Sequence, residues 1–339
     1  SEGEDELWTE YVALLRRHRI VPYDPIPATQ FDWELFESFA LPLYHGRLTD
    51  DAVPAPAIRF PEPPHPRESR EWDHFFRRVA DRLRDEGLFE RSFYYVDDEP
   101  LLSDYTQLIN DAQRIKAVEP ELRLLVTESF STPLRGLIDI WCPDIAIYDH
   151  PLPVFPLYGK GTGLKPEFQI NYGRSAYNAE RGDGGELWMY TCTSAQYFNY
   201  PNMFIDTPAS AQRVIPWMLA RLSARGIVYF RVSQAYKKEN DPWENRYYFN
   251  ANGDGTLVYP ARPDLTWFDR HGAVASLRMK ILRDGLEDYE YLQIAASDAE
   301  LEETKIVRRV ARSPLRWEGD HAAYIALRDE IAERIEARR

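Results

Sequence analysis

The chain has 339 residues, of which 44% are hydrophobic, and its 55 acidic and 41 basic side chains give a formal net charge of −14. This composition excludes a disordered chain, and the length allows one large α/β barrel or two ordinary domains. The negative field of the surface would repel phosphate backbones and anionic lipid headgroups, so we expect no nucleic-acid partner. No apolar run approaches the roughly 20 residues of a membrane span, so we expect no membrane insertion.

Cysteine and histidine usage argues against a disulfide framework and against a metal site. Cys142 and Cys192 are the only cysteines, and they form no paired CxxC motif for zinc. They allow one disulfide or two free thiols. The seven histidines are dispersed without an HxH or HExxH grouping, so we expect no metal and no cofactor.

The first third of the chain alternates predicted helices with short predicted strands. Apolar residues recur at helical spacing near the start, whereas the many prolines between residues 53 and 66 leave room only for a short strand. In chain order we predict a helix over 5–18, strands over 20–23 and 57–60, a helix over 67–87 and a strand over 92–96.

The alternation continues through the rest of the chain. We predict a helix over 101–118, strands over 123–126, 145–148 and 187–192, a helix over 209–224, a strand over 227–230, and helices over 273–296 and 321–337. Apolar strands that alternate with helices indicate a parallel sheet covered by helices. The best single prediction is an α/β fold, a (β/α)8 barrel of the TIM type that lacks its first strand here. We expect residues 1–300 to form the barrel and residues 301–339 to form a helical extension packed on it.

Three acidic residues follow the strand predicted over 92–96, in the sequence Asp97-Asp98-Glu99-Pro100. Acidic residues disfavour strands, so their position needs a reason. A solvated turn that caps the next helix would explain one of them. Barrel enzymes place catalytic groups at this end of their strands, which favours a catalytic role instead. Carboxylates in such a place suggest glycoside hydrolysis or proton transfer.

The spacing of Asp98 and Glu99 narrows the mechanism. Two carboxyl groups that flank one glycosidic bond are about 5–5.5 Å apart in retaining enzymes and about 6.5–9.5 Å apart in inverting ones. Neighbours on a strand point to opposite faces, so this pair is poorly placed for either. Consecutive acids suit substrate-assisted cleavage, in which the 2-acetamido oxygen of the sugar attacks the anomeric carbon. One acid then orients the amide, while its neighbour donates a proton to the leaving oxygen.

The sequence resembles the family 123 glycoside hydrolases and the related DUF4091 domains. The resemblance rests on five segments in a fixed order over roughly residues 90 to 295. They are Tyr95-Val96-Asp97-Asp98-Glu99-Pro100, Leu187-Trp188-Met189-Tyr190-Thr191-Cys192, Tyr200-Pro201-Asn202-Met203-Phe204-Ile205-Asp206, Gly253-Asp254-Gly255-Thr256-Leu257-Val258-Tyr259-Pro260 and Leu282-Arg283-Asp284-Gly285-Leu286-Glu287-Asp288-Tyr289-Glu290-Tyr291-Leu292.

The resemblance implies a retaining β-N-acetylgalactosaminidase with Glu99 as general acid/base and Asp98 as the residue that polarises the acetamido group. It also implies an N-terminal β-sandwich domain in the full-length protein and favours a secreted or periplasmic location. Two departures affect the substrate. Tyr229-Phe230 stands where the family usually has Tyr-Trp, and Ala261 follows Tyr259-Pro260 where the family commonly has Gly.

Aromatic residues make up 14% of the chain and concentrate where strands end, which suits a sugar-stacking pocket. Trp188, Tyr190 and Trp243 are the aromatic candidates for substrate binding. Hydrogen-bonding candidates are Asn171, Tyr172, Tyr200 and Asn202. We therefore expect a carbohydrate ligand, either a glycan or a glycoconjugate.

Two alternatives remain open from the sequence. The barrel can bind glycans or serve in assembly without cleaving anything, which the Phe230 departure favours and the retained acid pair disfavours. The other alternative is an ordinary two-carboxylate glycosidase that acts on a different sugar, with Glu99 as the acid and Glu128 on the next strand as the nucleophile.

Overall fold

The structure is a computed structural model that describes residues 2–25, 30–48, 53–148, 173–182, 184–197, 199–239, 241–262, 272–295 and 305–337. It divides into two compact units, Ser1–Ile140 (unit 1) and Trp141–Arg339 (unit 2). The predicted boundary between a barrel and a helical extension after residue 300 stays a prediction.

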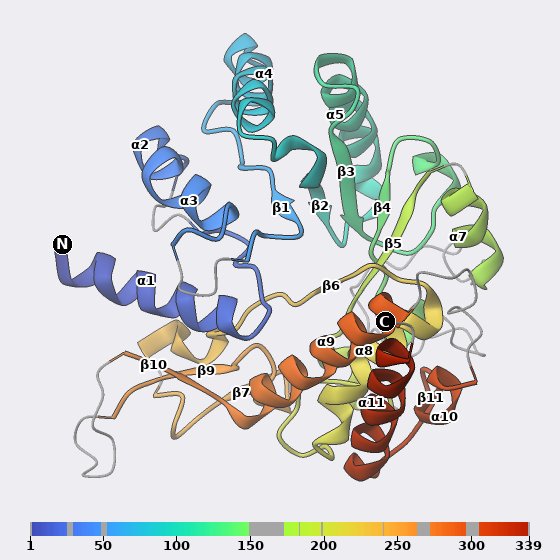
Figure 1. The fold of residues 1–339 in the computed structure, drawn as a ribbon. Helices are drawn as coiled ribbons and strands as arrows, with labels where there is room; N and C mark the ends of the chain where they lie inside the picture. The colour runs from blue at the N-terminus through green and yellow to red at the C-terminus, as the bar shows by residue number, and fades with distance from the viewer. Residues whose placement is uncertain are drawn as a thin grey trace. The chain divides into compact units, whose positions relative to one another are not determined.

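Unit 1 holds three parallel strands that alternate with helices (Figure 1). Its elements are α1 (Glu2–Arg17), α2 (Trp33–Leu35), the π-helix η1 (Phe36–Ala40), α3 (Leu41–Tyr44), β1 (Ile58–Arg59), α4 (Arg70–Asp85), β2 (Ser92–Asp98), α5 (Tyr105–Val118) and β3 (Arg123–Thr127). Strand β1 pairs with β2, and β2 pairs with β3. Helices α4 and α5 are joined by an ion pair between Asp73 and Arg114, with 2.7 Å between Oδ1 and Nε.

Helix α4 shows how the sequence specifies these elements. The Ser69 hydroxyl accepts a hydrogen bond from the Trp72 N–H and caps the first turn. Gly87, with φ +67°, follows the helix in the left-handed conformation that ends many helices. Between these ends one face is apolar and buried, and Phe76 on that face stacks on Phe60 with 5.3 Å between ring centroids. The helix predicted over 67–87 is confirmed.

Unit 2 adds further parallel strands, three small antiparallel sheets and a helical pair. Its elements are α6 (Ile145–Tyr148), α7 (Gly173–Gly182), β5 (Glu186–Tyr190), α8 (Ser210–Leu222), β6 (Gly226–Val228), β7 (Tyr247–Tyr248), β8 (Ala251–Asn252), β9 (Val258–Pro260), β10 (Ala273–Ala275), α9 (Leu277–Ala295), α10 (Val307–Val310), β11 (Ala311–Ser313), β12 (Arg316–Trp317) and α11 (His321–Glu336). Strand β4 (Ile140–Trp141) spans the boundary between the units.

The order of the parallel strands follows the chain, from β1 to β6, in one six-stranded sheet. Strands β5 and β6 are parallel like those of unit 1. The fold is therefore mixed α/β with a parallel sheet, as predicted, and it is compatible with part of a TIM-like barrel. The described residues do not show a complete (β/α)8 barrel.

Two predicted strands are wrong. Residues 145–148 form helix α6 because Asp144 caps it: the Asp144 Oδ1 accepts a hydrogen bond from the Ala146 N–H at 2.8 Å. The strand here is β4, which lies just upstream. Residues 20–23 form no strand, since Arg19 turns the chain with φ +64° and Pro22 has no N–H to donate to a neighbouring strand.

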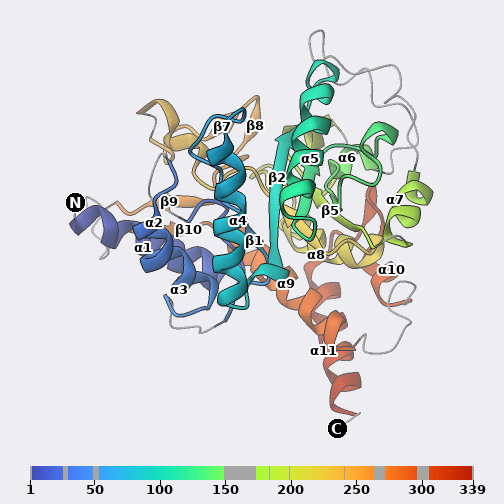
Figure 2. The same cartoon turned by 90° about the horizontal axis from the view of Figure 1, so that it is seen from above.

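Helices α8 and α9 pack closely because of two residues on α9 (Figure 2). A Cβ atom at Gly285 would lie 2.5 Å from the Arg213 backbone oxygen, so only glycine allows this approach. The Asp288 carboxylate is fully buried and accepts hydrogen bonds from Arg213 Nε at 2.8 Å, from Trp217 Nε1 at 2.9 Å and from Arg328. Asp288 of α9 therefore forms structural ion pairs with Arg213 of α8 and Arg328 of α11.

We predict that Asp288→Ala lowers the free energy of unfolding by about 3–5 kcal/mol, because it leaves the buried Arg213 charge without its partner. Asp284→Ala is the matched control. Its carboxylate is one-third exposed and lies 3.2 Å from its neighbour Arg283, so its removal should cost less than about 1 kcal/mol. Urea unfolding of the two variants measures the difference, and equal losses would contradict the structural role of Asp288.

Candidate active site

The carboxyl end of β2 carries the predicted acids, and a β-bulge sets their directions. Tyr95 pairs with Leu125 of β3, whereas Asp97 pairs with Val126, so β2 holds one extra residue between these pairs. An extra residue resets the alternation of side chains along a strand. Tyr95 and Asp98, which are three residues apart, therefore lie on the same face, where the Tyr95 hydroxyl donates a hydrogen bond to Asp98 Oδ1 at 2.6 Å.

Glu99 departs from strand geometry altogether. Its φ is +48°, in the left-handed region that a glutamate rarely occupies, and Pro100 follows it. Such conformations persist only where neighbouring groups hold them, and they cluster at functional sites. Here the Glu99 N–H donates a hydrogen bond to Thr127 Oγ1 at 3.1 Å, which ties the turn to the end of β3. Both Glu99 and Asp98 are exposed to solvent.

Asp98 Oδ1, the Tyr95 hydroxyl and Thr127 Oγ1 form a triangle of oxygens. Thr127 lies 2.9 Å from Asp98 Oδ1 and 2.6 Å from the Tyr95 hydroxyl. Burial and the nearby Asp98 charge raise the pKa of Tyr95, so its phenol keeps its proton. Two hydroxyl protons can thus serve the Asp98 carboxylate, which fixes the orientation of this side chain and leaves Oδ2 directed elsewhere.

The end of β1 supports this arrangement. The Tyr23 ring meets the Tyr95 ring edge to face, with 5.6 Å between centroids, and the Arg59 guanidinium lies 3.8 Å from the Tyr23 centroid. Arg59 also pairs with Asp24 at 2.6 Å and with Glu62 at 2.5 Å. These contacts fix the Tyr23 ring against Tyr95 and thereby restrict the movement of the Tyr95 hydroxyl.

Two more acids lie at this edge of unit 1. Asp97 is half-buried, and burial raises its pKa above the ordinary value. Its Oδ1 accepts the Asp98 N–H at 2.9 Å, which suits a structural role. Glu128 directly follows β3 and is half-buried, and its Oε1 accepts the Ser129 N–H at 2.6 Å. The alternative nucleophile therefore follows the strand next to β2, at the same edge of the sheet.

The aromatic candidates of unit 2 are tied into the protein. Trp188 is a buried residue of β5, and its indole N–H donates to Glu186 at 3.0 Å. Tyr190 is half-buried at the end of β5, where its N–H donates to the Pro143 carbonyl at 3.2 Å. Trp243 is half-buried and donates from its indole to the Pro260 carbonyl at 2.9 Å. Their roles as sugar-binding residues stay predictions, as do those of Asn171 and Tyr172, which lie outside the described residues.

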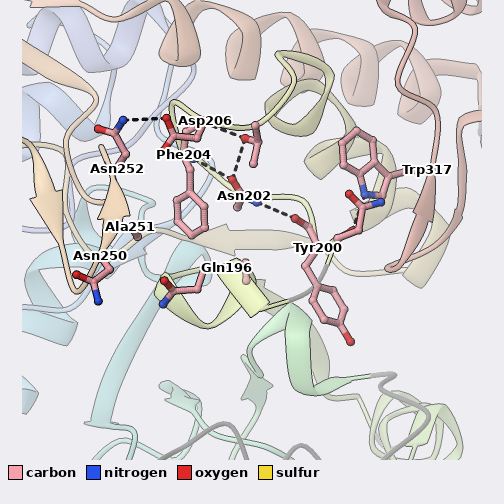
Figure 3. A pocket seen from close by; sticks show the side chains of 12 residues that line it. Gln196, Tyr200, Asn202, Phe204, Asp206, Asn250, Ala251, Asn252 and Trp317 are labelled. Atoms are coloured by element: carbon pink, nitrogen blue, oxygen red, sulfur yellow. Dashed lines mark hydrogen bonds between the residues drawn. The ribbon is translucent and has the colours of Figure 1, made fainter.

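Tyr200 and Asn202 line a pocket in unit 2, shown in Figure 3. We call it the amide pocket because its lining is rich in carboxamides, and its volume is about 220 Å³. The side chains and backbone that line it belong to Ala195, Gln196, Asn199, Tyr200, Asn202, Phe204, Asp206, Thr207, Asn250, Ala251, Asn252 and Trp317. Sequence reasoning found two of these residues and missed the others, which come from three separate stretches of the chain.

Asn202 organises one wall of the amide pocket. Its Nδ2 donates to the Tyr200 carbonyl at 2.9 Å, while its Oδ1 accepts from the Phe204 N–H at 2.9 Å and from the Thr207 hydroxyl at 3.0 Å. Both acceptor positions of this oxygen are thus used within the loop that leads from β5 to α8. The geometry suits a residue that positions the loop, and one N–H of the amide is left over.

Asp254 is a buried acid in the loop between β8 and β9. Asp254 is 1% exposed, and its Oδ1 accepts a hydrogen bond from the Tyr229 hydroxyl at 2.8 Å. Burial raises the pKa of Asp254 to about 6, against the opposing effect of the Tyr229 hydrogen bond. Arg278 fixes the surrounding loop by donating to the Gly253 carbonyl at 2.7 Å and to the Thr256 carbonyl at 2.5 Å.

Cys142 is buried and Cys192 is half-buried. Cys142 and Cys192 are free, which settles the question of a disulfide between them. Across the described ranges, no three His, Cys, Asp or Glu side chains gather in a way that would hold a metal ion. None of the helices in the described part of the chain is long and apolar enough to cross a membrane.

The pKa of Asp254 is higher in the folded protein than in the unfolded chain, so protonated Asp254 favours folding. This contribution to the free energy of unfolding is fully present below pH 4 and is lost as the pH rises through about 6. We predict that between pH 4 and pH 7.5 the wild-type protein loses about 2 kcal/mol more unfolding free energy than Asp254→Asn, which cannot ionise. Urea unfolding at both pH values measures this difference, since the contributions of the other carboxylates are the same in the two proteins and cancel. Parallel losses in the two proteins would contradict the burial of an ionisable Asp254.

Comparisons with known proteins identify the family. The model of the catalytic domain of glycoside hydrolase family 123 matches residues 58–295, which is more than half of the chain. No curated protein matches the chain. Among solved structures, the fold is similar to that of a family 123 glycoside hydrolase from Clostridium perfringens, studied for the hydrolysis of glycolipid glycans, with a TM-score of 0.51 and 15% sequence identity.

That structural match covers 82% of this chain and 46% of the clostridial chain, so this chain spans about half the length of that relative. At this identity the likeness concerns the fold alone. The family match includes β2 with Asp98 and Glu99, the loop with Tyr200 and Asn202, and helix α9 with Asp288. The chain therefore belongs to glycoside hydrolase family 123, and residues 58–295 correspond to its catalytic domain.

Proposed function

We propose that this chain is the catalytic part of a retaining glycosidase that removes a β-linked 2-acetamido sugar by substrate-assisted catalysis. The observation that carries the proposal is the pair of consecutive acids at the carboxyl end of β2. A bulge turns Asp98 toward Tyr95, and the left-handed backbone conformation of Glu99 turns that residue out of the strand. Family membership supports glycoside hydrolysis. The preference for N-acetylgalactosamine rests on the family resemblance.

In the first step the acetamido oxygen attacks the anomeric carbon, and the bond from this carbon to the leaving oxygen breaks. Glu99 gives its proton to the leaving oxygen, and an oxazoline forms on the sugar. Asp98 accepts a hydrogen bond from the acetamido N–H and stabilises the positive charge that develops there. Water then attacks the anomeric carbon, Glu99 takes a proton from this water, and the bond from the anomeric carbon to the oxazoline oxygen breaks, which restores the acetamido group. The two inversions at the anomeric carbon together retain its configuration.

Tyr95 and Thr127 act in this scheme as positioning residues. Both place a hydroxyl on Asp98 Oδ1, at 2.6 and 2.9 Å, so the carboxylate need not reorganise when charge develops on the substrate.

The whole protein has further proposed features. The clostridial family member is described as acting on glycolipid glycans, which supports a glycan or a glycoconjugate as the substrate class here. An additional N-terminal β-sandwich domain in the full-length protein stays a proposal from the family resemblance.

We predict that Glu99→Gln lowers kcat about 100-fold or more on substrates with poor leaving groups, because a glutamine has no proton to give. A dinitrophenyl glycoside is the matched substrate, since its leaving group needs little protonation and its cleavage step should suffer less. Steady-state rates on the two substrates measure the effect. Turnover that is unchanged on both would rule out Glu99 as the general acid.

Substrate assistance predicts that an aryl 2-acetamido galactoside is cleaved while its 2-hydroxy counterpart is not, because only the first carries its own nucleophile. Asp98→Asn should abolish most of this cleavage, whereas Glu128→Gln, the matched control just after β3, should retain it. Equal rates on the two aryl glycosides, with loss of activity in Glu128→Gln, would instead indicate a two-carboxylate glycosidase. Glycan binding without cleavage of either substrate would indicate a non-catalytic barrel.

A further inference from the structure

The amide pocket of unit 2 holds hydrogen-bonding groups that the protein itself does not use. Asn252 is 8% exposed, and its Nδ2 donates to Asp206 Oδ1 at 3.0 Å, but its buried Oδ1 has no partner. The carboxamides of Gln196 and Asn250 are exposed and make no hydrogen bond to another described residue. A buried acceptor without a partner costs free energy in a folded protein, so a site that keeps one calls for an explanation.

The turn that presents Asn250 to the pocket is strained. Phe249 and Asn250 form the two-residue connection between β7 and β8, with φ values of +44° and +65°. Such turns require left-handed residues, which asparagine tolerates and a bulky aromatic residue does not. Phe249 is also 72% exposed, so burial does not compensate for the strain. Strain of this kind concentrates at binding and catalytic sites.

The lining chemistry restricts what can bind. The amide pocket has one ionisable carboxylate, Asp206, and no cationic side chain, which disfavours phosphate and other anions. An aliphatic ligand would leave the Asn252 acceptor unsatisfied. A neutral ligand rich in hydroxyl groups can both donate to Asn252 and accept from Gln196 and Asn250. Half-buried Trp317 adds an aromatic surface on which the C–H face of a sugar can pack.

The volume of the amide pocket and the part of the chain that supplies Trp317 further restrict the ligands that can bind. Its volume of about 220 Å³ is below the roughly 300–1,000 Å³ of pockets that take drug-sized ligands, which suits one sugar unit of a longer chain. Trp317 lies outside residues 58–295, so one wall comes from a part of the chain that the family match does not include.

We propose that the amide pocket is a binding subsite for one neutral sugar unit of an oligosaccharide. Gln196 and Asn250 hydrogen-bond the sugar hydroxyls, Asn252 Oδ1 accepts a hydrogen bond from one hydroxyl, and Trp317 packs against the ring. The choice of a carbohydrate rests in part on the proposed glycosidase function. Binding does not require cleavage, so the two claims can fail separately.

The test compares the wild-type protein with the double variant Gln196→Ala/Asn250→Gly. Glycine accepts the left-handed turn, so the variant removes two carboxamides without adding strain. Gln293→Ala, an exposed carboxamide on α9, is the matched control. Calorimetric titration with chitotetraose and lacto-N-tetraose should show at least one of them binding to the wild type and the control, and binding about tenfold or more weaker in the double variant.

Cleavage of a small aryl 2-acetamido glycoside by the double variant should match the wild type, because neither Gln196 nor Asn250 belongs to the proposed catalytic pair. Unchanged oligosaccharide affinity in the double variant, or no binding of either probe by the wild type, would overturn the subsite. Weaker oligosaccharide binding by the double variant, together with a wild-type protein that cleaves no aryl glycoside, would support the subsite and contradict the proposed hydrolysis instead.

Discussion

The bulge in β2 is the constraint on which the candidate active site depends. Without the extra residue between Tyr95 and Asp97, strand alternation would place Tyr95 and Asp98 on opposite faces, and their 2.6 Å hydrogen bond would be impossible. The left-handed turn at Glu99 then separates the second acid from the first. Two consecutive acids can thus take different directions and different roles. An unbroken strand would not allow this division.

Among the described residues, several segments that carry the family resemblance stabilise the fold through packing, ion pairs or hydrogen bonds. Gly285 lets α8 and α9 approach, and Asp288 forms ion pairs with Arg213 and Arg328. Arg278 holds the Gly253–Thr256 loop, and Asn202 holds the loop between β5 and α8. Only the segment on β2 exposes acids at a strand end. A family motif therefore identifies a fold through packing constraints as much as through chemistry.

The sequence was a good guide to local elements and a poor guide to features that arise from pairing. The apolar face of α4, its Ser69 cap and its terminal Gly87 are all local, and that helix was predicted correctly. Helix α6 was mistaken for a strand because its four residues are apolar and its cap, Asp144, looks like any loop acid. The bulge in β2 depends on its register with β3. The amide pocket is lined by residues from three stretches that are far apart in the sequence, so no local sequence pattern predicts it.

The affinity for a galacto-configured thiazoline, a stable analogue of the oxazoline intermediate, tests most directly whether Asp98 and Glu99 divide the chemistry. If Asp98 holds the acetamido nitrogen as the ring closes, the wild-type protein should bind the thiazoline at least about 100-fold more tightly than N-acetylgalactosamine, as expected for an analogue of a high-energy species. Asp98→Asn should lose most of this advantage. Equal affinities for the two ligands, or a thiazoline affinity that Asp98→Asn leaves intact, would contradict the assignment.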